Sequence, residues 1–237
     1  MQLIKCKILP NEKKGWKLTT IDDIEWEKVH KIIEKLSIAK RKTAIKFSHR
    51  WLSSGSKNFA EPMICPHCKQ RDSSEIDHDH FLTCEFSSPH QTKRINEFSV
   101  LLVSMKTPQE LVSLLKNGLS VFYNNSNNQK ISSPLSELST KQSMIGWNQL
   151  ARGRISKGFT KFMSLHYTAN KTKSFSGEGW SKRVIEFLLN THIETWLSHC
   201  NEIHTSSSKA IKYLTHRSLL ITIEFLFDKG KSLPQHL

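Results

Sequence analysis

Three of the chain's five cysteines fall within residues 65–84, a stretch that also contains histidines. Cys65 and Cys68 are separated by two residues, and His80 and Cys84 by three, which gives the pattern C-x2-C-x11-H-x3-C. Three thiolates and one imidazole are a ligand set that Zn²⁺ prefers in a closed, tetrahedral, structural site. The spacing therefore predicts one Zn²⁺ bound by these four side chains.

Two short local structures must bring these ligands together. Pro66 favours a tight turn between the first two cysteines. A helix that begins near Asp79 places His80 and Cys84 on one face, because residues four apart are neighbours on a helix. His78 and His67 compete with His80 as the fourth ligand. The alternative interpretation is a set of unrelated thiols beside a histidine of the core.

The composition indicates a folded chain that does not span a membrane. Its 237 residues are 37% hydrophobic and include six Trp and twelve Phe, enough to bury a core. No apolar run approaches the ~20 residues that a transmembrane helix needs. The first ten residues are too short and too charged for a signal peptide. Because the odd number of cysteines suggests a reducing compartment, we expect an intracellular protein, nuclear or cytoplasmic.

The formal net charge of +14 comes from 35 Lys and Arg against 21 Asp and Glu. The cysteine-rich segment is close to neutral, whereas the regions before and after it are basic. A basic balance favours polyanionic partners through phosphate contacts, so nucleic acid, either DNA or RNA, is the expected partner. The alternative is a solvated, lysine-rich surface without a partner.

One basic cluster stands ahead of the cysteines, on a helix expected from Ile38 to about Leu52. Ile45, Trp51 and Leu52 are expected to pack inward. The cluster is the best candidate for a phosphate-binding surface, although any single lysine can be simply solvated. Its members are Lys40, Arg41, Lys42, Lys46 and Arg50.

Few runs alternate with a period of two, so the predicted fold is mostly α: helical, bundle-like halves with a small inserted zinc-binding segment. The polar run at residues 124–129 predicts a boundary between an N-terminal helical region, 1–123, which contains the zinc segment 65–84, and a C-terminal helical region, 131–237.

The helix boundaries follow from capping signals. Asp22, with Glu25 three residues later, predicts a helix start through a capping box. Thr107, followed by Pro108, predicts another, with Thr as the N-cap. The glycines at 177–179 predict a break before the longest helix, expected over residues 180–204.

Three patches of the sequence resemble short motifs that occur together in one family. Residues 46–55, KFSHRWLSSG, resemble the motif K-x-x-H-x-W-L-P-T-G. Residues 65–84, CPHCKQRDSSEIDHDHFLTC, resemble C-x-x-C … E-T-x-x-H-L-x-x-C, and residues 196–204, WLSHCNEIH, resemble W-x-x-x-R-N-x-x-H. In this order the motifs are those of the zinc-binding C-terminal region of non-LTR retrotransposon reverse transcriptases, and the resemblance implies the same zinc ligands.

The chain departs from that family at several positions. Ser53, Ile76 and Cys200 stand where the family often has Pro, Thr and Arg. Reverse transcriptases hold two metal ions on paired aspartates, but the only Asp-Asp pair is Asp22-Asp23, at an expected helix cap. The resemblance therefore implies a detached C-terminal piece, zinc-containing, associated with nucleic acid and without catalysis.

Two other functions stay open. Residues 77–80, Asp-His-Asp-His, resemble the centre of His-Me nucleases, in which a histidine activates water beside a divalent metal. A zinc segment can also stabilise a protein-interaction surface.

Cys200 and His204 are spaced as a second pair of metal ligands, but core packing is the favoured interpretation of both.

Overall fold

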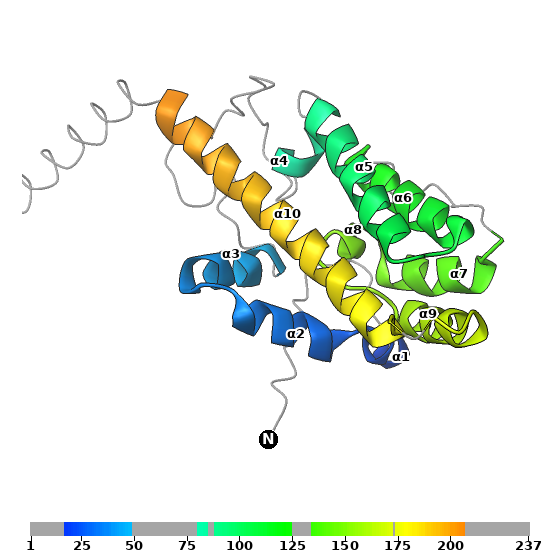
Figure 1. The fold of residues 1–237 in the computed structure, drawn as a ribbon. Coiled ribbons are helices and arrows are strands. Elements are labelled where there is room, and N and C mark those ends of the chain that lie inside the picture. Colours follow the sequence, from blue (N-terminus) through cyan, green and yellow to red (C-terminus); the bar gives the residue numbers. More distant parts are fainter. Residues whose placement is uncertain (1–16, 49–79, 85–87, 125–133, 173, 207–237) are drawn as a thin grey trace, which may run out of the picture. The chain divides into compact units, whose positions relative to one another are not determined.

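The computed structural model describes residues 17–48, 80–84, 88–124, 134–172 and 174–206. Most of these residues are helical, which confirms the mostly α fold (Figure 1). Within the described ranges, extended pairing is limited to an isolated antiparallel bridge between Ile24 and Ser156. No helix in those ranges is both long and apolar enough to cross a membrane.

The chain divides into two compact units, Met1–Trp196 and Leu197–Leu237. The predicted boundary at residues 124–130 lies almost wholly outside the described residues and stays a prediction. The helices are α1 (Leu18–Asp22), α2 (Trp26–Lys35), α3 (Ile38–Ser48), α4 (His80–Thr83), α5 (Ser88–Ser104), α6 (Gln109–Tyr123), α7 (Ser136–Ile145), α8 (Trp147–Leu150), α9 (Lys157–Ala169) and α10 (Gly177–Ser206).

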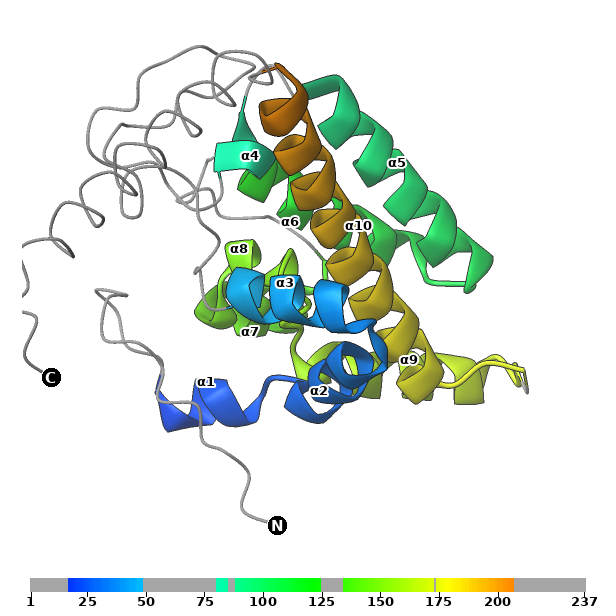
Figure 2. The same ribbon diagram turned by 90° about the vertical axis from the view of Figure 1, so that its left-hand side faces the viewer.

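The core of the first unit collects around the part of α10 that precedes Leu197. Val184, Ile185, Leu188 and Leu189 of this helix are almost fully buried. Figure 1 shows α10 passing between the α2–α3 pair and the α5–α6 pair, and Figure 2 shows α5 alongside it. Because both pairs cover the same helix, its apolar residues are enclosed from opposite sides.

The predicted helix start at Asp22 is wrong, because α1 ends there and α2 begins only at Trp26. The carboxylate of Asp23 accepts a hydrogen bond of 2.6 Å from the hydroxyl of Ser156, at the start of α9. Ser156 also forms the bridge with Ile24. Asp23, next to the predicted cap residue Asp22, thus attaches this segment to α9.

Glu25 completes this attachment instead of a capping box. Its side chain is nearly buried and accepts a hydrogen bond from the hydroxyl of Thr160 on α9. Lys28 neutralises the same carboxylate at 2.5 Å and also reaches Glu178 of α10 at 2.9 Å. A buried carboxylate is tolerated here because it is both paired and hydrogen-bonded.

The start of α6 also differs from its predicted form. Thr107 is not the N-cap, because its hydroxyl accepts a hydrogen bond of 2.9 Å from the buried indole N–H of Trp180. Pro108 occupies the N-cap position, without a side-chain cap hydrogen bond. The predicted break at 177–179 is likewise wrong, since α10 begins at Gly177, where a Cβ would lie 2.3 Å from the carbonyl oxygen of Thr160.

Gly118 allows α6 to approach α8 closely. A Cβ at this position would lie 2.1 Å from Cε3 of Trp147, far inside van der Waals contact. The Trp147 ring is nearly buried, and its N–H donates to the hydroxyl of Ser143 at 3.0 Å, so the ring is held in place. This contact joins helices from the two sides of the 125–133 segment.

We predict that Gly118→Ala lowers the free energy of unfolding by about 1–3 kcal/mol, because the added methyl group must displace a fixed indole ring. Gly179→Ala is the matched control, since Gly179 is exposed within α10 and the nearest atom to its Cβ would be the Ser176 hydroxyl oxygen at 3.1 Å, with no ring in the way. The control should gain up to about 1 kcal/mol from helix propensity. Urea unfolding of both variants measures this, and equal stabilities would contradict the close approach.

Candidate metal site and basic helix

Half of the predicted zinc-ligand set is described: His80 begins α4 and Cys84 directly follows it. The backbone N–H of Cys84 donates to the carbonyl of His80 at 2.7 Å, so the two residues are joined by a helical i, i+4 hydrogen bond. Cys84 is buried and His80 is half-buried. Residues in this relation share one helical face. The helix predicted near Asp79 is therefore present, and it begins at His80.

The other half of the set, Cys65 and Cys68, lies outside the described residues, as does the competing His78. Within the described part of the chain, no group of three or more His, Cys, Asp or Glu side chains that can hold a metal is found. Cys84 is a free cysteine, so its sulfur is not used in a disulfide. A thiol and an imidazole on one turn are donors that suit Zn²⁺, and zinc binding stays a prediction.

Two apolar side chains anchor the α4 turn in the core. Leu82 is fully buried, and Phe81 is nearly so. The Phe81 ring packs edge-on against Trp196 at 5.0 Å and against Phe47 of α3 at 6.3 Å between centroids. Since a helix of four residues is not stable alone, these contacts position the turn that carries His80.

The predicted phosphate-binding residues of α3 divide into two groups. Arg41 donates to the carbonyls of Glu34 and Leu36 at the end of α2, where a cation also stabilises the negative helix terminus. Lys40 forms an ion pair of 3.3 Å with Glu194 of α10. The structure thus gives both side chains partners within the fold. Arg50 lies outside the described residues.

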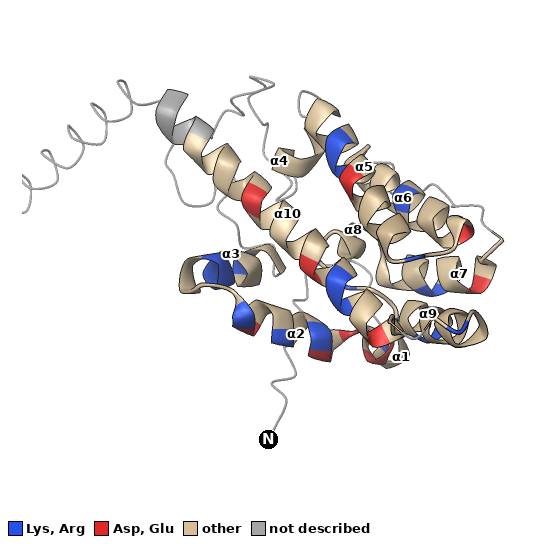
Figure 3. Ribbon diagram, viewed as in Figure 1, with Lys and Arg blue, Asp and Glu red and all other residues tan. Residues whose placement is uncertain are grey.

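Lys42 and Lys46 form the second group. Both are exposed, stand one turn apart, and make no ion pair within the described part of the chain. Figure 3 shows basic residues on α3, which contains no acidic residue, whereas α2 carries both basic and acidic residues. Like charges four residues apart repel each other, so an anion that contacts both lysines would relieve this repulsion.

The inward face of α3 differs from the prediction for Ile45. Ile45 is 41% exposed and Ile38 is 71% exposed, whereas Ala44 and Phe47 are buried. Trp51 and Leu52 lie outside the described residues. The solvent face of α3 therefore combines isoleucines with Lys42 and Lys46.

Arg154 fixes the end of α3. Its guanidinium donates to the carbonyl of Ser48 at 2.6 Å and to the amide oxygen of Gln149 at 2.6 Å, and it lies over the Trp26 ring at 5.4 Å. A cation beside the last carbonyls stabilises a helix C-terminus. Sequence reasoning missed this residue, because Ser48 and Trp26 lie far from it along the chain.

His192 of α10 contacts Tyr123 of α6 and Phe47 of α3, so it connects three helices. Its Nδ1 lies 2.5 Å from the carbonyl oxygen of Leu188, and its Nε2 lies 2.9 Å from the hydroxyl oxygen of Tyr123. Because a carbonyl can only accept, Nδ1 carries the proton, and Nε2 accepts from the Tyr123 hydroxyl. The Phe47 ring stacks on the imidazole at 5.8 Å.

Burial keeps His192 neutral by lowering its pKa to about 3, and the nearby Arg94 and Arg152 guanidinium groups act in the same direction. Burial also raises the pKa of Tyr123 to about 12. A permanently neutral imidazole in an aromatic layer supports packing and is unsuited to proton transfer near pH 7.

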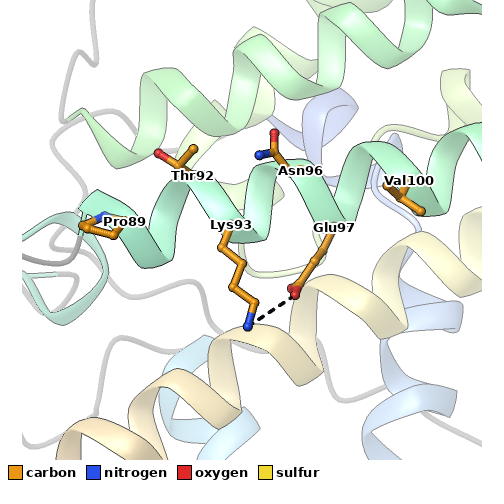
Figure 4. A pocket seen from close by; sticks show the side chains of 6 residues that line it. All are labelled: Pro89, Thr92, Lys93, Asn96, Glu97 and Val100. Carbon is orange, nitrogen blue, oxygen red and sulfur yellow. Dashed lines mark ion pairs between the residues drawn. The ribbon is translucent and has the colours of Figure 1, made fainter.

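A shallow pocket of about 550 Å³ lies along α5 (Figure 4). Lys93 and Glu97 point to the same side and form an ion pair of 3.8 Å. The lining residues described there provide no nucleophile and base pair, so this pocket does not suggest a reaction. They are Pro89, Thr92, Lys93, Asn96, Glu97 and Val100.

Comparison with models of known families, with curated proteins and with solved structures found no match for this chain.

We predict that His192 makes stability depend on pH. The folded-state pKa lies below the unfolded value of 6.5, so the unfolded chain binds more protons between pH 6.5 and about 3. Stability should fall as the pH drops through this window, by up to about 1.4 kcal/mol per pH unit from this group. Urea unfolding between pH 7 and pH 4.5 measures the slope.

His192→Gln should remove this part of the pH dependence, whereas His30→Gln should keep it, because His30 is exposed on α2. Any acid release of bound metal affects all three proteins, so the difference between their slopes isolates the imidazole. Parallel pH profiles for wild type and His192→Gln would contradict the argument.

Proposed function

We propose that the chain is a non-enzymatic, zinc-containing protein that associates with nucleic acid. The observation that carries the proposal is the turn from His80 to Cys84. A helical hydrogen bond joins these two candidate ligands, and the buried side chains between them anchor the turn in the core. Cys65 and Cys68 supply the remaining thiolates. A closed Cys₃His site holds Zn²⁺ as a structural ion and ties metal binding to local folding.

The exposed lysines of α3 support the choice of nucleic acid as partner. Lys42 and Lys46 are free to contact phosphates, and Phe47 of the same helix packs against Phe81 beside the zinc-ligand turn. The contact between the Phe47 and Phe81 rings therefore connects the predicted zinc segment to the helix that carries Lys42 and Lys46. Contacts of this kind give salt-dependent binding with little sequence preference.

The resemblance to the C-terminal region of non-LTR retrotransposon reverse transcriptases supports the same function. It suggests that the chain derives from such a region, detached from a polymerase. Asp23, one of the paired aspartates in the sequence, holds the start of α9 through Ser156, a structural role. This use of the carboxylate fits a non-enzymatic protein.

We predict one Zn²⁺ per purified chain, lost in Cys84→Ser. Cys200→Ser is the matched control, because Cys200 is the other free cysteine described and is half-buried on α10. The control should keep the metal, since Cys200 is not one of the predicted ligands. Metal analysis by mass spectrometry gives the stoichiometry.

A folded, zinc-free wild type would contradict the zinc proposal. Two ions per chain, with one lost in Cys200→Ser, would instead indicate a second site at Cys200 and His204. Loss of zinc in Cys68→Ser as well as Cys84→Ser would assign the ligands from both halves of the pattern.

We predict that replacing Lys42 and Lys46 with Gln weakens binding to mixed-sequence DNA and RNA alike. The slope of log K against log salt should flatten by about one for each lost phosphate contact. Lys116→Gln with Lys161→Gln is the matched control, because both lysines are exposed on other helices, α6 and α9. Fluorescence anisotropy over a salt series measures the slopes.

Equal slopes for the two double variants would contradict a binding surface on α3. Wild-type protein that shows no salt-sensitive binding would favour the protein-interaction alternative. Plasmid nicking with Mg²⁺ or Mn²⁺ that disappears in His78→Ala would favour the His-Me nuclease alternative and overturn the non-enzymatic proposal.

A further inference from the structure

Gln91 lies on α5 and contacts the end of α4 from outside that helix. Its side chain is only 6% exposed. The amide nitrogen donates to the carbonyl of Leu82 at 2.7 Å and to the carbonyl of Cys84 at 3.1 Å. The last carbonyls of a helix have no partner within it, so this one side chain satisfies two of them.

These two hydrogen bonds fix the backbone where it carries a candidate metal ligand. The α4 helix has only four residues, so its own hydrogen bonds do not hold it rigid. Phe81 and Leu82 secure its apolar side in the core. Gln91 secures its carbonyl end, and the direction of the Cys84 Cα–Cβ bond is set by that backbone.

We propose that Gln91 is a positioning residue for metal binding: it presents Cys84, together with His80, in the geometry that a tetrahedral Zn²⁺ requires. This inference rests on the proposed zinc site. Residues that orient metal ligands typically change metal affinity by roughly 10–100-fold when they are replaced. The effect arises because a ligand held in place before binding loses less freedom when the ion arrives.

The test compares two buried glutamines that differ in position. Gln91→Met keeps the length of the side chain and removes its N–H donors. Gln142→Met is the matched control, because Gln142 is fully buried and also bridges backbone groups, donating to the carbonyls of Gly146 and Arg154, both at 3.2 Å. These bonds lie at the end of α7 and before α9, on elements other than α4.

Competition with a chromophoric chelator measures the zinc affinity of each protein, and thermal unfolding of the metal-free forms measures stability. Gln91→Met should bind one zinc roughly 10–100-fold more weakly than wild type, whereas Gln142→Met should bind it with wild-type affinity even though it is less stable. Gln91→Glu, which has the same shape but no N–H donor, should behave as Gln91→Met.

A purely structural role for Gln91 gives a different result. If Gln91→Met and Gln142→Met bind zinc equally well, the inference is wrong while the proposed zinc site stands. If both Gln91 variants stay unfolded in saturating zinc, the residue is required for the fold itself, and the inference is again wrong. If the wild type binds no zinc, the proposed zinc site is wrong, and the inference about Gln91 is wrong with it.

Discussion

The buried hydrogen bond between Tyr123 and His192 joins α6 to α10, and much of the first unit depends on it. An imidazole can be buried at low cost only if both ring nitrogens are satisfied. Leu188 and Tyr123 meet that requirement, and Phe47 then stacks on the ring. The aromatic layer around His192 therefore consists of side chains from three helices that are far apart in the sequence.

The same layer supports the candidate site. Phe81 contacts Phe47 and Trp196, so the α4 turn with its candidate ligands is attached to α3 and α10. A metal bound at this turn would add to contacts that already exist, and in the proposed site Cys65 and Cys68 would contribute the other two ligands. The turn that carries the candidate ligands is thereby connected to α3, and so to its exposed lysines, through packed rings whose contacts do not depend on charge.

Helix content follows from the sequence because the spacing of apolar residues is a local signal. The first residue of a helix does not follow from the sequence in the same way, because side chains that could cap a helix form hydrogen bonds with distant residues in the folded chain. Glu25 accepts a hydrogen bond from Thr160, and Thr107 accepts one from Trp180, so neither has the capping role that the sequence predicts. The turn that joins His80 to Cys84 is predictable, since its four-residue spacing is itself local. Gln91 is not, because no pattern in the sequence indicates that an amide reaches back to α4.

The basic cluster shows why composition alone overstates a binding surface. Arg41 and Lys40 belong to the same run as Lys42 and Lys46, yet the first two have backbone or carboxylate partners inside the fold. A cation that already satisfies a helix end gains less from a phosphate, since it must give up an existing bond to contact one. Lys42 and Lys46 have no such bond to give up within the described part of the chain. If α3 binds phosphates, most of its contribution to the binding free energy should therefore come from these two residues.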